Sequence, residues 1–291
     1  MKVFELVKVE FGDIVRSNKF VALTVIFTLM LLSGLCRVME PTLVTENQFA
    51  GVRRLGFEVA RTIGDFVCFL VPIVAIVLGY DSISGKIEKG AIKALLAQPI
   101  YRDQVILSVI IAGLLALALN VVIPLALALS TITLLLGITP TLGDIVLLTE
   151  YMACVMVFAL AYYSLSVFIS AASSNSTRSL VAGIMVWLVF SFMLPRLTPA
   201  LIRLIIGPPR YEQTQMGNII VLKMSKEYIK KYTIIRSKIL SFTLDYHFRS
   251  IQDQLLLSLS IRDYSGLIVL LVFSAAALLA SFIVFVKKEV R

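Results

Sequence analysis

The sequence predicts an all-α polytopic membrane protein with six transmembrane helices. Of its 291 residues, 59% are hydrophobic and 15% are charged, whereas a soluble domain carries roughly 25% charged residues. The mean hydropathy is +0.94. Apolar runs that approach or exceed about 18 residues recur along the chain, which is the length that a helix needs to cross a bilayer. We therefore expect a single transmembrane domain over residues 1–291.

Residues 1–17 are predicted to form an amphipathic helix before the first span. Apolar side chains recur there every three to four residues, and charged side chains fall between them: the apolar positions are Val3, Phe4, Val7, Phe11, Ile14 and Val15. This pattern with modest overall hydrophobicity favours a helix that lies in the membrane interface. A plain cytosolic lead-in with incidental periodicity is the alternative.

The six predicted spans are separated by short turns and two longer polar segments. They cover about residues 20–36, 62–80, 105–136, 145–172, 179–194 and 264–286. The third run is long enough for one helix kinked at Pro124 or for a hairpin of two short spans. One helix is favoured because no cluster of turn residues interrupts the run. The segment 195–263 is predicted to be external.

Basic residues in the short flanking segments set the predicted orientation. They precede the first span, follow the last, and lie between spans two and three and between spans four and five. With six spans these segments share one side, so the chain is predicted to lie in the cell membrane with both termini cytoplasmic. The basic residues of segments 38–61 and 195–263 do not follow this pattern. We assign the net charge of +9 to contact with the lipid bilayer rather than with nucleic acid.

A polar, basic stretch at residues 81–102 separates the second and third spans. A short amphipathic helix is predicted over residues 86–96, with a basic stripe formed by Lys86, Lys89 and Lys93. Pro99 ends this helix, and Gly90 lets another backbone approach closely. A helix of this length is unstable alone in water, so it needs a docking surface on a partner. An ordinary solvated loop is the alternative.

Eight residues of this stretch form a spaced pattern: Asp81, Gly85, Glu88, Gly90, Leu95, Leu96, Pro99 and Arg102. The pattern resembles the signature of type 2 ABC transporter permeases, which are the membrane subunits of many prokaryotic exporters. Gly90-Ala91-Ile92 stands where that family usually has Gly-Thr-Leu, and Ala97 stands where serine is usual. The start of the chain, with Glu10 and Arg16, is similar to the family's interfacial elbow helix, and the six-span layout is also similar.

The resemblance implies a permease subunit that works with a second permease copy or a paralogue and with two copies of a separate ABC ATPase. Residues 84–100 would form the coupling helix, which docks on the ATPase and transmits its closure to the spans. The implied interface comprises Lys86, Glu88, Lys89, Gly90, Lys93, Leu95, Leu96, Pro99 and Arg102. No cofactor is expected on this chain, and the partner would bind ATP and magnesium, because the sequence has no G-x-x-x-x-G-K-[ST] phosphate-binding loop.

Polar side chains within the predicted spans are candidates for a cargo pathway, with helix packing as the alternative. They are Asn120, Tyr162, Tyr163 and Ser166. A secondary transporter driven by an ion gradient is the alternative function. It is disfavoured because no central acid accompanies the span prolines, Pro72 and Pro124. An enzyme is not expected, because the one histidine, His247, lies outside the predicted spans and cannot supply a metal site by itself.

Overall fold

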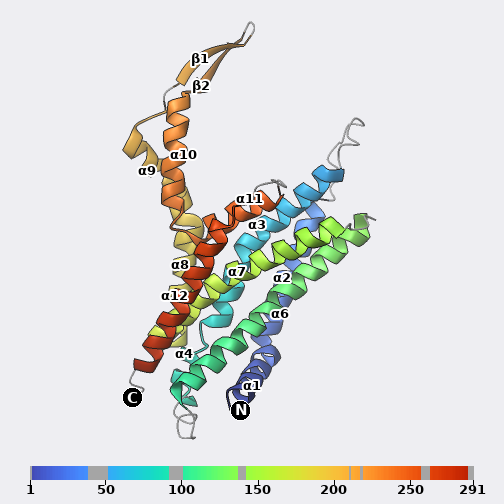
Figure 1. The fold of residues 1–291 in the computed structure, drawn as a ribbon, viewed down its shortest axis with the longest axis vertical. Helices are drawn as coiled ribbons and strands as arrows, with labels where there is room; N and C mark the ends of the chain where they lie inside the picture. The colour runs from blue at the N-terminus through green and yellow to red at the C-terminus, as the bar shows by residue number, and fades with distance from the viewer. Residues whose placement is uncertain are drawn as a thin grey trace.

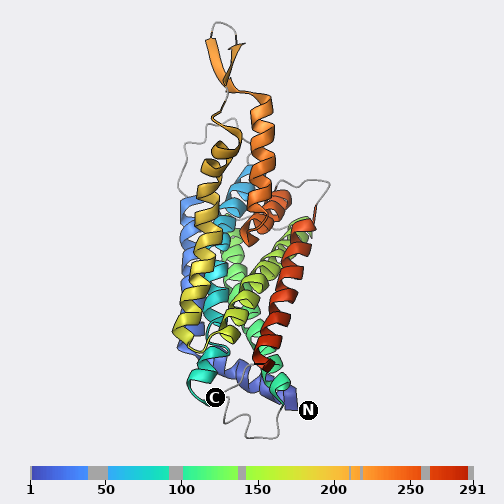
Figure 2. The same cartoon turned by 90° about the vertical axis from the view of Figure 1, so that its left-hand side faces the viewer.

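The structure is a computed structural model, which describes residues 2–38, 52–91, 101–136, 142–209, 211–216, 219–256 and 263–287. Long helices lie side by side and give the molecule two ends (Figures 1 and 2). Both termini and the short helix α4 lie at one end, which we call the terminal end. An arm of two helices and a hairpin extends from the opposite, distal end.

Helices make up most of the described chain. Within the described residues, five helices are long and apolar enough to cross a membrane, or six if the bent pair α1–α2 counts as one span. A two-stranded hairpin is the exception to the predicted all-α class. The elements are α1 (Lys2–Arg16), α2 (Asn18–Val38), α3 (Val52–Gly79), α4 (Ser84–Glu88), α6 (Arg102–Leu136), α7 (Leu142–Ala172), α8 (Ser176–Leu188), η2 (Val189–Met193), α9 (Leu194–Ile206), β1 (Tyr211–Met216), β2 (Ile219–Met224), α10 (Lys226–Leu240), α11 (Leu244–Leu256) and α12 (Ser265–Lys287).

The first two helices meet at a bend of 58°. Ser17 stabilises this bend, because its hydroxyl donates to the Ile14 carbonyl at 2.6 Å and accepts from the Phe20 N–H at 3.2 Å. α1 packs against α6 and buries Val7, whereas Phe4 is 77% exposed. The helix predicted over residues 1–17 is therefore present, although Phe4 does not share its buried face. The location of α1 in a membrane interface stays a prediction.

α6 is one continuous helix of 35 residues that contains Pro124. At 1.5 Å per residue it is about 53 Å long, which exceeds a hydrocarbon core of about 30 Å. The prediction of one long helix is confirmed, and the hairpin of two short spans does not occur.

The fifth span continues beyond its predicted end at Leu194. α8, the π-helical segment η2 and α9 form one apolar helical stretch from Ser176 to Ile206. Pro195 lies in the first turn of α9. A proline inside a helix removes one backbone donor and interferes with the helical bond one turn earlier, and here the wider π turn η2 stands directly before α9. The segment that we predicted to be external, 195–263, therefore begins inside a helix.

The distal arm consists of α9, the hairpin β1–β2 and α10. The strands are antiparallel, with Tyr211 opposite Met224 at one end and Met216 opposite Ile219 at the other. α9 and α10 lie side by side below the hairpin (Figure 2). The arm is thus a paired-helix stalk that carries a hairpin away from the bundle.

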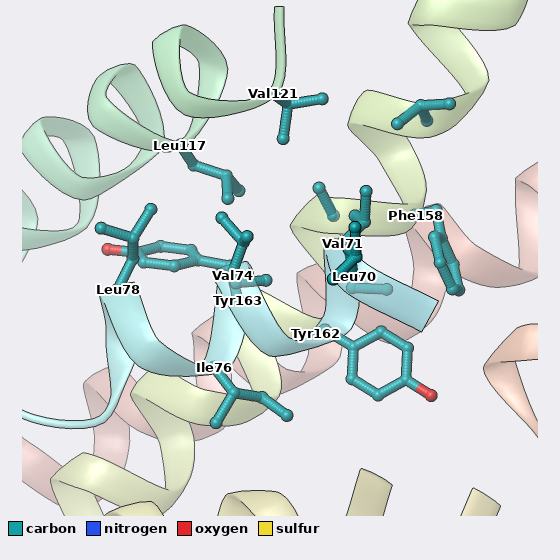
Figure 3. Close-up of a cluster of buried hydrophobic side chains, with 14 of the residues drawn as sticks. Leu70, Val71, Val74, Ile76, Leu78, Leu117, Val121, Phe158, Tyr162 and Tyr163 are labelled. Carbon is teal, nitrogen blue, oxygen red and sulfur yellow. The ribbon is translucent and has the colours of Figure 1, made fainter. Parts of the chain in front are cut away.

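The core lies where α3 packs between α6 and α7 (Figure 3). Val71 of α3, Leu117 of α6 and Phe158 of α7 are all fully buried there. A Cβ atom added to Gly113 of α6 would lie 1.8 Å from the Tyr163 hydroxyl oxygen. A side chain at position 113 would therefore collide with the Tyr163 ring where it now lies, and glycine leaves room for that ring between α6 and α7.

Candidate functional site

The short helix α4 follows α3 after a tight turn at the terminal end. The Ser82 hydroxyl donates to the Gly79 carbonyl at 2.7 Å, and the Ser84 hydroxyl donates to the Tyr80 carbonyl at 2.8 Å. These bonds satisfy carbonyl groups that the end of α3 leaves without helical partners. The chain leaves α4 through Gly90, whose φ of +69° lies in the left-handed region that favours glycine.

The beginning of α4 is fixed to α7. The backbone N–H groups of Ile83 and Ser84 donate to the Ser170 hydroxyl at 3.1 and 3.0 Å, and all three residues are buried. A Cβ atom added to Gly85 would lie 3.2 Å from the Asp81 Cβ atom, which is a tight contact. The first turn of α4 therefore has little room for a larger residue and is held directly by α7.

Two ion pairs connect this region with the start of the chain. Lys86 of α4 pairs with Glu10 of α1, and the two side chains are 20% and 17% exposed. Asp81 accepts a hydrogen bond from the Lys19 ammonium group at 2.7 Å, and that group also lies 5.0 Å from the centre of the Tyr80 ring. Partial burial strengthens the attraction within such pairs, because less water screens the charges.

The end of α4 is bonded to the start of α8. The Glu88 carboxylate accepts from the Ser176 hydroxyl at 2.7 Å, from the Ser176 N–H at 3.1 Å and from the Asn175 amide at 3.2 Å. The Asn175 side chain itself caps α8 by accepting from the backbone N–H groups of Thr177 and Arg178. A negative charge is favourable at a helix N-terminus. Glu88 therefore extends the cap of α8 and joins it to α4.

The predicted interface residues fall into three groups. Lys86 and Glu88 are bonded to the protein's own helices. Lys89 is exposed and Gly90 is half-buried in the turn that follows α4, and Arg102 begins α6. The other predicted interface residues lie outside the described residues: Lys93, Leu95, Leu96 and Pro99.

The polar residues predicted for a cargo pathway are all buried, but they are not brought together at one site. The Asn120 amide donates to the Thr24 hydroxyl at 2.8 Å and to the Phe20 carbonyl at 3.2 Å, both in α2. The Ser166 hydroxyl donates to the Ile76 carbonyl of α3 at 2.9 Å. Each bond joins two helices, which favours the packing interpretation. A role in a cargo pathway stays a prediction.

The hydroxyl groups of Tyr162 and Tyr163 have different hydrogen-bond partners, although the two residues are neighbours in α7. The two hydroxyl groups point away from one another (Figure 3). The Tyr163 hydroxyl is buried and has no hydrogen-bond partner within the described part of the chain. The Tyr162 hydroxyl donates to the Asp245 carboxyl of α11 at 2.6 Å. Burial raises the pKa of the Asp245 carboxyl above its ordinary value, although the hydrogen bond from Tyr162 opposes this effect. Tyr162 thus anchors α11 at the distal end.

α11 also contacts α3. The Arg249 guanidinium lies 3.2 Å from the Asp65 carboxylate, and both side chains are largely exposed. The Cys68 sulfur lies 3.7 Å from the side-chain oxygen of Gln252. α11 is therefore bonded to two helices of the bundle, α3 and α7, whereas α4 at the opposite end is bonded to three.

The described residues offer no metal site. Within them, no group of three or more His, Cys, Asp or Glu side chains could hold a metal ion. The thiols of Cys68 and Cys154 are buried and belong to different helices.

The helix predicted over residues 86–96 is not continuous, because α4 covers Ser84–Glu88 and the chain turns at the left-handed Gly90; residues 92–96 lie outside the described residues. No described atom lies within 4 Å of a Cβ atom added to Gly90, so the predicted close approach of another backbone is not observed.

The partners of α4 were also missed: none of Ser170, Asn175 and Ser176 was predicted to contact it, and Glu10 was noted only as part of the first helix. Asn175 and the Ser-Thr pair after it do follow a long apolar run, which is a recognisable helix-start signal. That signal predicts a cap but does not reveal that Glu88 would bond to it.

A family model described as ABC-2 family transporter protein matches residues 4–290. The match includes α4, its partner helices and the distal arm. The chain belongs to this ABC-2 transporter family. It is therefore a multi-pass membrane subunit of an ABC transporter, and its predicted resemblance to type 2 ABC permeases is confirmed. ABC-2 permeases normally work with an ABC ATPase partner. The comparison with individually curated proteins gave no match.

Proposed function

We propose that this ABC-2 protein is the permease subunit of an exporter that is driven by a separate ATPase. It pairs with a second permease copy or a paralogue and with two ATPase subunits, which bind ATP and magnesium. Residues 84–100 dock on the ATPase as a coupling helix. The main support is the bonding of α4 to α1, α7 and α8. A displacement of α4 is therefore passed to three helices at once.

The bonds of α4 divide the predicted interface residues into those that transmit movement within the permease and those that dock on the ATPase. Lys86 and Glu88 hold α4 to α1 and α8, so their task is to transmit movement within the permease. Lys89 is exposed beyond these bonds, and the left-handed Gly90 turns the chain after it. Lys89 therefore presents part of the docking surface to the ATPase, and residues 92–100, which complete the proposed coupling helix, lie outside the described residues. In this proposal Glu88 acts within the permease, whereas the sequence pattern alone places it at the interface with the ATPase.

The orientation in this proposal has the terminal end in the cytoplasm and the protein in the cell membrane. Both termini and α4 lie at the same end of the bundle (Figures 1 and 2). An even number of spans is consistent with this arrangement. The part of the segment 195–263 that follows α9, with the hairpin, α10 and α11, then lies outside the cell.

Co-purification with the partner ABC ATPase tests the docking surface. Lys89→Glu reverses one exposed charge beside α4 and is expected to reduce the amount of bound ATPase several-fold. Lys230→Glu makes the same charge change in the distal arm and is the matched control. Equal ATPase binding by both variants would contradict docking at this surface.

A second variant tests transmission separately from docking. Glu88→Gln keeps the shape of the side chain but weakens its bonds to Ser176. We expect normal binding of the ATPase with a lower rate of export for each ATP hydrolysed. Export that proceeds in an ion gradient without any ATPase would instead favour a secondary transporter.

A further inference from the structure

The distal arm is far more basic than it is acidic. α9 contains Arg196 and Arg203 and has no acidic residue in its sequence. α10 contains one acidic residue, Glu227, and five basic ones: Lys226, Lys230, Lys231, Arg236 and Lys238. All seven basic side chains of α9 and α10 are exposed. Such a concentration of one charge sign creates a positive field that attracts anions from solution.

Most of this charge is not neutralised by the arm itself. Lys231 pairs with Glu227 at 2.7 Å, four residues earlier in α10. Within the described residues, the other four basic side chains of α10 lie in no ion pair: Lys226, Lys230, Arg236 and Lys238. Lys226 and Lys230 are four residues apart and so share one face of the helix, about 6 Å apart along its axis.

The packing of α10 leaves the basic side chains on its free sides. The partly buried residues that contact its neighbours are mainly apolar or aromatic, among them Tyr228, whose hydroxyl donates to the Gly207 carbonyl of the stalk at 3.3 Å. The cations therefore do not stabilise the stalk through contacts with α9. The mutual repulsion of these cations is slightly unfavourable for the helix. An anion from outside the arm would reduce this repulsion.

The geometry favours an extended anionic polymer over a membrane surface. A helix that binds lipid headgroups lies in the plane of the membrane. α10 instead runs along the long axis of the molecule and carries the hairpin away from the bundle (Figures 1 and 2). The same surface is unlike the core of a protein interface, where charged residues are depleted.

We propose that the distal arm binds a linear polyanion, with phosphate or carboxylate groups along its length, through the free faces of α10. Several separate cations bind successive anionic groups, so that binding is multivalent. It should depend little on the order of the units in the polymer, and it should weaken as salt rises. The placement of this polymer outside the cell rests on the proposed orientation. The binding itself requires neither the ATPase nor export.

Long-chain polyphosphate is the test probe, with the full-length protein held in nanodiscs of uncharged lipid. The unmodified protein is expected to bind, with an affinity that falls steeply as salt rises. Lys226→Glu combined with Lys230→Glu is expected to weaken binding about tenfold at low salt and to flatten the salt dependence. Lys8→Glu combined with Arg16→Glu makes the same change of net charge in exposed residues of α1, and it is expected to bind as the unmodified protein does.

Three results would overturn the proposal. One is the absence of polyphosphate binding, and another is an equal loss of binding in the two charge-reversed variants, which would show a response to net charge alone. The third is binding to vesicles of anionic phosphatidylglycerol without binding to polyphosphate, which would assign the arm to a membrane. Because the assay contains no ATPase, none of these results bears on the coupling role of α4.

Discussion

The two ends of the bundle each hold a short helix, and they hold it by different means. The start of α4 is held by buried bonds to Ser170, but its end is held at the terminal end by the bonds of Glu88, which water can reach. α11 is bound at the distal end chiefly by a buried contact, since Tyr162 is 0% and Asp245 is 7% exposed. The end of α4 thus depends on exposed bonds, whereas α11 combines the buried Tyr162–Asp245 bond with the exposed Arg249–Asp65 pair.

This difference indicates which helix is free to move. An exposed ion pair contributes only about 0–1 kcal/mol, because water replaces the lost partner. A buried group that loses its hydrogen-bond partner costs about 1–3 kcal/mol. We therefore expect the end of α4, which Glu88 holds, to shift while its exposed bonds exchange. The start of α4 should stay bonded to Ser170, and α11 should stay bonded to Tyr162. A movable end of α4 fits the proposed coupling role.

The largest expected effect lies at the distal end. Tyr162→Phe removes the donor to the buried Asp245 carboxyl and is expected to lower the free energy of unfolding by about 1–3 kcal/mol. Tyr163→Phe is the matched control, because it removes a buried hydroxyl that has no partner within the described residues. Its effect is expected to be neutral or slightly stabilising. Unfolding of both variants in one detergent measures the difference, and equal losses would show that the Tyr162–Asp245 bond does not anchor α11.

A smaller effect is expected in the pH dependence of stability. The raised pKa of Asp245 means that the folded protein favours the protonated carboxyl. This contribution to stability is therefore complete at low pH and is lost as the pH rises from about 4, the ordinary carboxyl value, through the raised pKa. Asp245→Asn cannot ionise and still offers Tyr162 an acceptor. Unfolding midpoints across this pH range should fall less steeply for Asp245→Asn, and parallel curves would contradict the assignment.

The next effect concerns the turn after α4. Gly90→Ala forces a residue with a side chain into the left-handed region, which costs about 1 kcal/mol, although no atom lies within 4 Å of the added Cβ. Gly12→Ala in α1 is the control, because its added Cβ also meets no atom within 4 Å and alanine favours a helix. Hydrogen exchange of the α4 backbone should be faster only in Gly90→Ala. Unchanged exchange would show that this turn does not help to position α4.

The smallest effect is expected for the Lys86–Glu10 pair. Replacing each residue by alanine, singly and together, gives a double-mutant cycle with an expected coupling energy of about 0.5–1 kcal/mol. The coupling should decrease as salt is added, because water and ions reach part of the pair. Hydrogen exchange of α4 provides the measurement. A coupling as large as that of Tyr162 and Asp245 would remove the contrast between the two ends.

Local patterns in the sequence predicted much of the helical framework. The unbroken apolar run predicted one long α6, and the glycine and proline residues around positions 85–99 indicated a short element between α3 and α6. Such features are local, because the helical period and the turn residues depend on neighbours within a few positions. The hairpin was missed although Gly217-Asn218 between two short runs is a hairpin signal. The continuation past Pro195 was missed because η2 is not visible in the apolar pattern.

The contacts that give the candidate site its character could not be predicted in the same way. Glu10 and Lys86 are 76 positions apart, and Ser176 and Glu88 are 88 positions apart. Whether such residues meet depends on how α1, α7 and α8 pack around α4, which one sequence does not specify. Asp245 was missed for the same reason, since its burial follows from the return of α11 onto the bundle.

Site-specific photo-crosslinking tests the coupling role of α4 most directly. A photoreactive benzoylphenylalanine replaces Lys89 in one protein and Lys230 in another, and each protein is irradiated in membranes that contain the partner ABC ATPase. We expect an adduct with the ATPase from position 89, with a yield that changes when nucleotide is added, and none from position 230. An adduct from position 230, or none from position 89 in active membranes, would contradict docking of the ATPase at α4.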